Sequence, residues 1–101
     1  MHSLKKHPLF DSDLEAAALR YGPRNPAVAA CLIDEAVIAI RTVAAAPLRY
    51  SVWRGETRRV RLHRFPHLVF YEFHDDTIYL LAIAHGARGL PALLNERRPN
   101  G

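Results

Sequence analysis

The 101-residue chain has one cysteine and no long uninterrupted hydrophobic run. Cys31 has no second cysteine with which to form an internal disulfide, which suits a reducing compartment. No apolar segment approaches the ~18 residues that a transmembrane helix needs. The basic pair Lys5-Lys6 is followed by amphipathic sequence, whereas a signal peptide continues with an apolar stretch. We therefore expect a cytoplasmic protein without a membrane partner.

The motifs of several enzyme classes are also missing. The sequence has no Gly-rich phosphate loop, no G-x-S-x-G turn, no HExxH motif and no cysteine pair for zinc. His63 and His67 have the i,i+4 spacing of a helical metal site, but Phe65-Pro66 between them prevents a helix. Asp75-Asp76 has the composition of a turn. From these absences we expect the protein to have no metal site and no cofactor.

Positive charge is concentrated in one part of the chain. Apolar residues make up 50% of the sequence, which suits a single globular domain spanning 1–101, and the net charge is +4. Between positions 41 and 64, Glu56 alone opposes a run of arginines: Arg41, Arg49, Arg54, Arg58, Arg59, Arg61 and Arg64. This run is either a solvated face or a surface for an anionic partner, since arginine suits phosphate and carboxylate recognition.

Three consecutive strands are predicted between 59 and 85. In the first, over about 59–64, Val60 and Leu62 alternate with polar residues, and Phe65-Pro66 ends the run. The second, over 67–74, is dense in aromatic and β-branched residues. The third, over 77–85, is almost wholly apolar, so we expect a central strand covered on both faces. Asp75-Asp76 provides a turn of hairpin length between the last two.

Two helices are predicted before these strands. The first covers about 9–21, and its start has two candidate signals: Pro8 in the first turn, or a capping box of Ser12 and Glu15. The second covers about 26–45, with Asn25 as N-cap followed by a proline. The short loop between the helices favours an antiparallel hairpin lying on the sheet.

The predicted fold is α+β, with the helical hairpin packed on a small, mostly antiparallel, twisted sheet. Residues 48–57 are expected to form a loop, in which Tyr50 and Trp53 either stack on nucleic-acid bases or anchor the loop to the core. Residues 86–101 are expected to be a tail, with about one turn of helix between Leu90 and Arg97. One common core is predicted to bury Leu32, Ile40, Leu62, Phe70 and Leu81.

The order of short motifs resembles the ParE/RelE superfamily of toxins from bacterial toxin–antitoxin modules. The motifs are Arg61 on a strand, Phe65-Pro66-His67, Tyr71, and Ala82-x-x-His85-x-x-Arg88. The two preceding helices also fit, so the resemblance covers nearly the whole chain, and it implies a first strand over about 2–7. The sequence departs from the family at His67, where tyrosine is commoner, and at Leu93-Leu94, where aromatics are common.

This resemblance implies a type II toxin of the plasmid-stabilisation class, closer to ParE than to RelE. A ParE toxin inhibits DNA gyrase and is neutralised by a cognate antitoxin, with which it forms a hetero-oligomer. The RelE alternative is a ribosome-dependent messenger endoribonuclease, in which Arg61 and Arg88 hold the phosphate and His85 is the acid or base. A structural His85 at a strand end is the other interpretation of that residue.

The departure at Leu93-Leu94 adds a third hypothesis, a toxin-fold protein without toxicity. The side chains expected to contact a target or an anion are Arg59, Arg61, Arg64, Arg88, Arg97 and Arg98.

Overall fold

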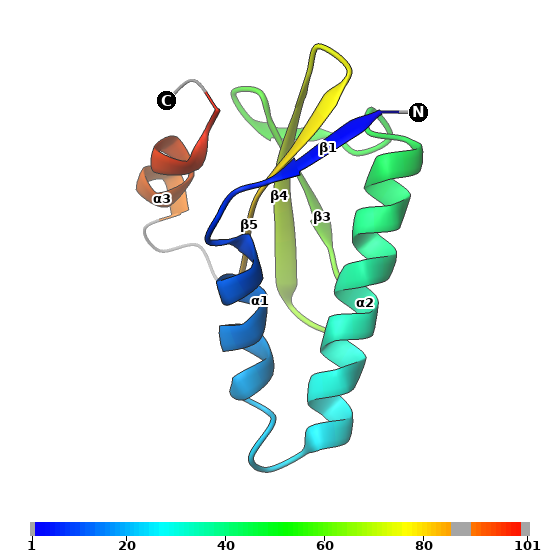
Figure 1. Ribbon diagram of the computed structural model, residues 1–101, viewed down its shortest axis with the longest axis vertical. Coiled ribbons are helices and arrows are strands. Elements are labelled where there is room, and N and C mark those ends of the chain that lie inside the picture. The colour runs from blue at the N-terminus through cyan, green and yellow to red at the C-terminus, as the bar shows by residue number, and fades with distance from the viewer. Residues whose placement is uncertain (1, 86–89, 100–101) are drawn as a thin grey trace.

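A computed structural model describes residues 2–85 and 90–99 (Figure 1). The elements are β1 (Ser3–Lys6), α1 (Phe10–Leu19), α2 (Pro26–Ala45), β2 (Val52–Arg54), β3 (Thr57–Arg61), β4 (His67–His74), β5 (Thr77–His85) and α3 (Leu90–Arg97). One sheet has the order β1-β5-β4-β3-β2, in which β1 is parallel to β5 and the other pairs are antiparallel. The predicted α+β class is confirmed. No helix in the described ranges is long and apolar enough to cross a membrane.

The two helices of the hairpin begin differently. The Asn25 side chain accepts a hydrogen bond from the Val28 N–H at 3.3 Å, and Pro26 is the first residue of α2, as expected. Both signals considered for α1 are wrong, because α1 begins at Phe10. The Ser12 hydroxyl donates back to the Leu9 carbonyl at 2.9 Å, so it does not cap the N–H groups of the following turn.

The β4–β5 hairpin forms the centre of the sheet. Asp75 and Asp76 have φ angles of 49° and 60°, the left-handed values that a two-residue type I′ turn requires. The register pairs Phe70 with Ala82 and Tyr71 with Leu80, leaving Leu81 as an extra residue in β5. Such a bulge interrupts the alternation of side chains between the two faces.

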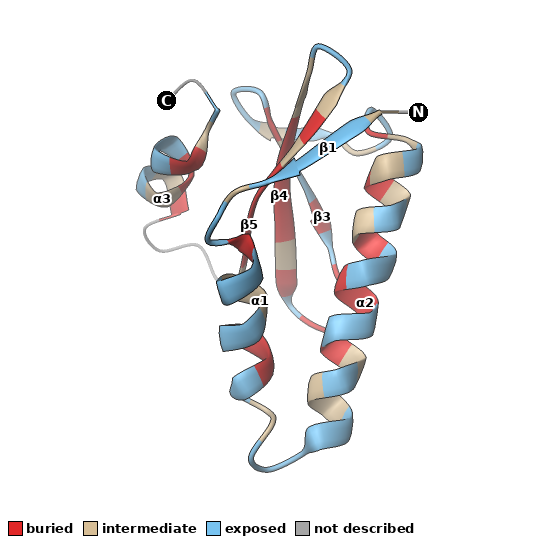
Figure 2. Ribbon diagram, viewed as in Figure 1, coloured by how far each residue is buried: buried red, intermediate tan, exposed pale blue. Residues whose placement is uncertain are grey.

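The bulge divides the apolar side chains between two clusters. Figure 2 marks where the buried residues lie along the helices and strands. Leu32 and Leu62 are buried with α1, α2 and one face of the sheet, and the partly buried Ile40 packs against them. Phe70 and Leu81 lie in the second cluster, under α3. The prediction of one common core is therefore wrong, because Phe70 alternates with Val69 and Tyr71, and the bulge turns Leu81 to the same side as Phe70.

The segment expected to be a loop contains a short strand. β2 joins β3 through the two-residue turn Gly55-Glu56, with Arg54 opposite Thr57. Gly55 has φ of 56°, a conformation that favours glycine at the first position of a hairpin turn. The Trp53 ring lies 5.2 Å from that of Phe70, which confirms the anchoring role.

Helix α3 covers the second cluster. It is longer than the single turn expected, and Leu90 and Leu94 are buried against the sheet. This helix is the reason that β5 has cover on both faces, since α1 packs on the opposite side.

Replacing Phe70 by alanine should lower the free energy of unfolding by about 3–5 kcal/mol, because it leaves a cavity under α3. Chemical denaturation monitored by circular dichroism measures this change. Leu48→Ala is the control, since that side chain is exposed. An unchanged denaturation midpoint for Phe70→Ala would contradict the burial of Phe70 in the second cluster.

Candidate functional site

A concave pocket of about 680 Å³ lies on the sheet beside α3. Its lining comes from β2, β3, the β3–β4 loop, β4, the end of β5 and the start of α3: Trp53, Arg59, Arg61, Pro66, Leu68, His85 and Leu90. No acidic side chain is among these described lining residues. The pocket therefore combines cationic and apolar groups, a composition suited to an anion with an apolar or planar part.

Strand geometry brings the two pocket arginines together. Arg59 and Arg61 are two residues apart on β3, so both side chains project from the same face of the sheet. The Arg59 guanidinium lies 5.5 Å from the centre of the Trp53 ring, within range of a cation–π interaction. Both arginines are exposed, and no hydrogen bond or ion pair joins either to an acid within 2–85 and 90–99. They remain available to an anionic partner.

His85 borders this pocket from the end of β5. It is opposite His67 on β4, and the two ring centroids are 5.2 Å apart. Both histidines also line a smaller cavity of about 220 Å³ against α1. By strand alternation His85 shares the face of Ile83, whereas the pocket arginines share the face of Leu68. His85 is thus at the edge of the arginine pocket.

Arg64 lies apart from the pocket, on the α2 side of the sheet. Its backbone N–H and its Nε donate to the two carboxylate oxygens of Glu35 at 2.8 and 2.9 Å. Burial alone would raise the pKa of Glu35, but the hydrogen bonds from Arg64 lower that pKa overall. Arg64 therefore fixes the β3–β4 loop to α2.

Arg97 and Arg98 hold α3 in place. Arg97 is buried, and its guanidinium donates to the Asp13 carboxylate and, at 3.2 Å, to the Leu81 carbonyl. Arg98 Nε donates to Glu72 at 2.6 Å and its Nη2 to Glu56 at 2.9 Å. Because Arg97 is buried, its side chain is not accessible to a target in this structure. Arg88, also a predicted contact, lies outside the described residues.

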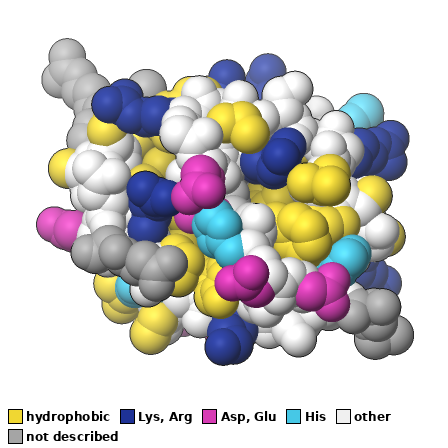
Figure 3. All heavy atoms as spheres, turned by 90° about the horizontal axis from the view of Figure 1, so that it is seen from above, with side chains coloured by type: hydrophobic (Ala, Val, Ile, Leu, Met, Phe, Trp, Pro, Cys, Tyr) yellow, Lys and Arg dark blue, Asp and Glu magenta, His cyan; other side chains and the backbone are white. Residues whose placement is uncertain are grey.

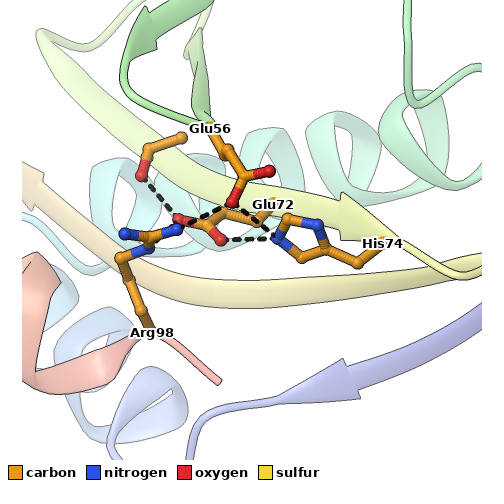
Figure 4. A network of polar contacts seen from close by, with 5 residues as sticks. Glu56, Glu72, His74 and Arg98 are labelled. Carbon is orange, nitrogen blue, oxygen red and sulfur yellow. Dashed lines mark hydrogen bonds and ion pairs between the residues drawn. The ribbon is translucent and has the colours of Figure 1, made fainter. Parts of the chain in front are cut away.

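Glu72 is the buried centre of this second set of contacts (Figure 4). Its fully buried carboxylate accepts hydrogen bonds from Thr57 at 2.8 Å and Arg98 at 2.6 Å, and is 2.7 Å from His74 Nε2. Burial alone would raise the pKa of Glu72, but the hydrogen bonds from His74, Thr57 and Arg98 lower that pKa overall. Sequence inspection missed Glu72, because it stands within an apolar strand.

The molecular face seen from above carries mixed charges. Acidic, basic and histidine side chains alternate there with apolar ones (Figure 3). The arginines of the basic run differ in environment: Arg64 is paired with Glu35, whereas Arg59 and Arg61 line a pocket that has no acidic residue among its described lining.

A second groove of about 470 Å³ lies between α2 and β3. Ile38, which is 61% exposed, and Thr42 line its α2 side, and Val60 and His63 are among its β3-side residues. β2 pairs with β3 only at Thr57 and Arg58 in the described ranges, so the outer edge of β3 is open from Arg59 to Arg61. The groove therefore offers apolar surface, the positive charge of Arg61 beside the Glu35–Arg64 ion pair, and an unpaired strand edge.

Comparison with known proteins gives a consistent result. The model of a family described as the ParE toxin of the type II toxin–antitoxin system parDE matches residues 4–90. No curated protein matched the chain. A structure of the chromosomal ParDE system from P. aeruginosa is similar with a TM-score of 0.75 and 20% identity, covering 86% of this chain and 98% of that one.

A second similar structure is that of the RelBE2 toxin–antitoxin complex from Mycobacterium tuberculosis. Its TM-score is 0.54 and its identity 18%, covering 84% of this chain and 98% of that one. At these identities the two likenesses show the shared fold.

Glu72→Gln should lower the free energy of unfolding by about 1–3 kcal/mol at pH 7, because charge-assisted hydrogen bonds are lost. The pKa of Glu72 is lower in the folded state than in the unfolded state. The ionised carboxylate therefore adds to the free energy of unfolding above the unfolded pKa, and this stabilisation is lost as the pH falls below about 4.

The stability difference between wild type and Glu72→Gln should therefore shrink between pH 7 and pH 3. Urea denaturation across this range measures it, with Glu96→Gln at an exposed position on α3 as the control. A difference that stays constant with pH would contradict the role of the Glu72 carboxylate.

Proposed function

Because the chain belongs to the ParE toxin family of type II toxin–antitoxin systems, we propose that it inhibits DNA gyrase and is neutralised by a cognate antitoxin. The match of the family model over residues 4–90 carries this proposal, since it includes the helical hairpin and all of the sheet except Ser3. The proposed place of action is the cytoplasm, where gyrase and DNA are found. Inhibition on this account is by binding, so it needs no catalytic group.

The composition of the arginine pocket supports a binding role. Cleavage of RNA by its own 2′-hydroxyl needs a base, an acid and cations for the phosphate. Among the described lining residues His85 is the one histidine, the residue type that most often transfers protons in catalysis, and it stands at the pocket edge. Arg59 and Arg61 satisfy the need for cations, and equally suit recognition of a phosphate or carboxylate on a macromolecular target.

Helix α3 is the proposed contact surface for gyrase. Ala92, Asn95 and Glu96 are exposed, while Leu94 packs inward and Leu93 is half-buried. The departure from the family at Leu93-Leu94 is thus compatible with a helix that docks on the sheet and presents its other face to a partner. Removing the tail after Gly89 would uncover Phe70 and Leu81, so substitutions on the exposed face are the more selective test.

The groove between α2 and β3 is the proposed antitoxin site. An acidic, amphipathic segment would bury its apolar side chains against Ile38 and pair its charges with Arg61. Its backbone would also hydrogen-bond to the open edge of β3, the mode of strand addition. Both similar structures are described as toxin–antitoxin systems, which supports a partner of this kind.

The ribosome-dependent nuclease is the alternative function, and one observation favours it. The pocket brings Arg59, Arg61 and His85 to a single cavity. In that case the arginines would stabilise the phosphate of the messenger while His85 protonates the leaving oxygen or deprotonates the 2′-hydroxyl.

Ala92→Trp should weaken inhibition of gyrase supercoiling at least tenfold, because a bulky side chain on exposed α3 blocks close contact. Inhibition is measured on purified gyrase with relaxed plasmid. Ala30→Trp, at an exposed position on α2, is the matched control and should inhibit as wild type does.

If wild type leaves gyrase unaffected but cleaves messenger in ribosome-containing extracts, and His85→Gln abolishes that cleavage, the nuclease alternative replaces the gyrase proposal. A loss of ~10²–10⁴-fold is the size expected for a general acid or base.

Ile38→Asp should weaken binding of the antitoxin at least tenfold, because it places a charge in the apolar part of the groove and repels acidic side chains. Calorimetry at low ionic strength with the product of the neighbouring reading frame measures this. Ile33→Asp on the same helix is also at an exposed position but does not line the groove, and should bind normally. Equal affinity for both variants would exclude the α2–β3 groove.

A further inference from the structure

His67 has an unusual environment for a polar side chain. It is 3% exposed, and its Nδ1 is buried without a hydrogen-bond partner in the described part of the chain. Tyr21 and Phe65 pack around the ring, with centroids 6.5 and 6.3 Å away. A buried nitrogen without a partner is costly and is rare in folded proteins, so it indicates a ligand, an ion or a water.

A second imidazole lies directly across the strand pair. His67 and His85 are register partners on β4 and β5, and their ring centroids are 5.2 Å apart. Two imidazole nitrogens bound to one tetrahedral metal at ~2.0–2.1 Å place their ring centres ~5 Å apart. The observed separation therefore matches that of two histidine ligands on a single ion.

A cavity of mixed polar and apolar lining adjoins the two rings. It has about 220 Å³ and is lined by both histidines, by Asp13 and Arg20 of the α1 region, and by small apolar residues. This volume holds several water molecules, which could complete the coordination of a metal. The site is separate from the Glu56, Glu72 and His74 cluster, where Arg98 already provides a positive charge.

We propose that His67 and His85 form a binding site for a divalent transition metal of the Zn²⁺ class, completed by water from the adjoining cavity. The inference is independent of the proposed function, and it departs from the expectation of no metal site. Sequence inspection did not suggest it, because the two ligands are on different strands and come together only through the β4–β5 register.

The charged side chains around the cavity set how tightly an ion would be held there. The positive charge of Arg20 acts against a cation, while the Asp13 carboxylate is already paired with Arg97. We therefore expect a readily reversible site, and metal bound there would engage His85, which also borders the arginine pocket.

Untagged protein stripped with a chelator and then titrated with ZnCl₂ tests this proposal. Calorimetry gives Kd, and thermal unfolding should show Tm raised by roughly 5–10 °C at free Zn²⁺ about tenfold above Kd. His85→Gln should remove the shift, and its exposed position should leave the metal-free fold intact. His67→Gln is the second variant and should also remove it.

His74→Gln is the matched control, because it disables the other cluster that could hold a metal. The proposal predicts that this variant keeps the full Zn²⁺ shift. It is overturned if wild type shows no shift, or if the shift survives in His85→Gln and disappears in His74→Gln.

Discussion

The structure depends on the burial of β5 from both sides. This strand is in the interior of the sheet, between β1 and β4, and its apolar side chains divide between two clusters at the Leu81 bulge. Because neither face of an apolar strand is stable in water, the chain must supply cover on each side. α1 and α2 cover one face and α3 the other, which makes the C-terminal helix a part of the folded core.

Charge pairing then separates structural arginines from available ones. Arg64, Arg97 and Arg98 bind the carboxylates of Glu35, Asp13 and Glu72, and so connect loops and helices to the sheet. Arg59 and Arg61 are instead in a pocket without acidic lining residues. Burial makes the internal pairs costly to break, whereas exposed cations exchange water for an anionic partner at little cost.

Local signals predicted much of the fold, and long-range packing decided the rest. The Asn25 cap, Pro26 and the Asp75-Asp76 turn act within a few residues, so the bounds of α2 and the β4–β5 hairpin followed from sequence. β2 was not predicted, because its three residues are exposed or half-buried and are too few to show the alternation of apolar and polar residues that identifies a strand. The bulge at Leu81 and the partners of Arg97 and Glu72 depend on register and on α3 docking, which no local pattern encodes. Arg59, Arg61 and His85 were candidates by residue type alone; that they line one pocket, with His85 on the opposite face of the sheet, depends on strand register.

The most direct test of the central claim is induced expression in bacteria that lack the antitoxin, with DNA and messenger followed in the same culture. Gyrase inhibition predicts double-strand breaks and loss of supercoiling soon after induction, with messenger intact, and suppression of both effects when the antitoxin is co-expressed. Messenger cleavage with unbroken chromosomes would contradict it.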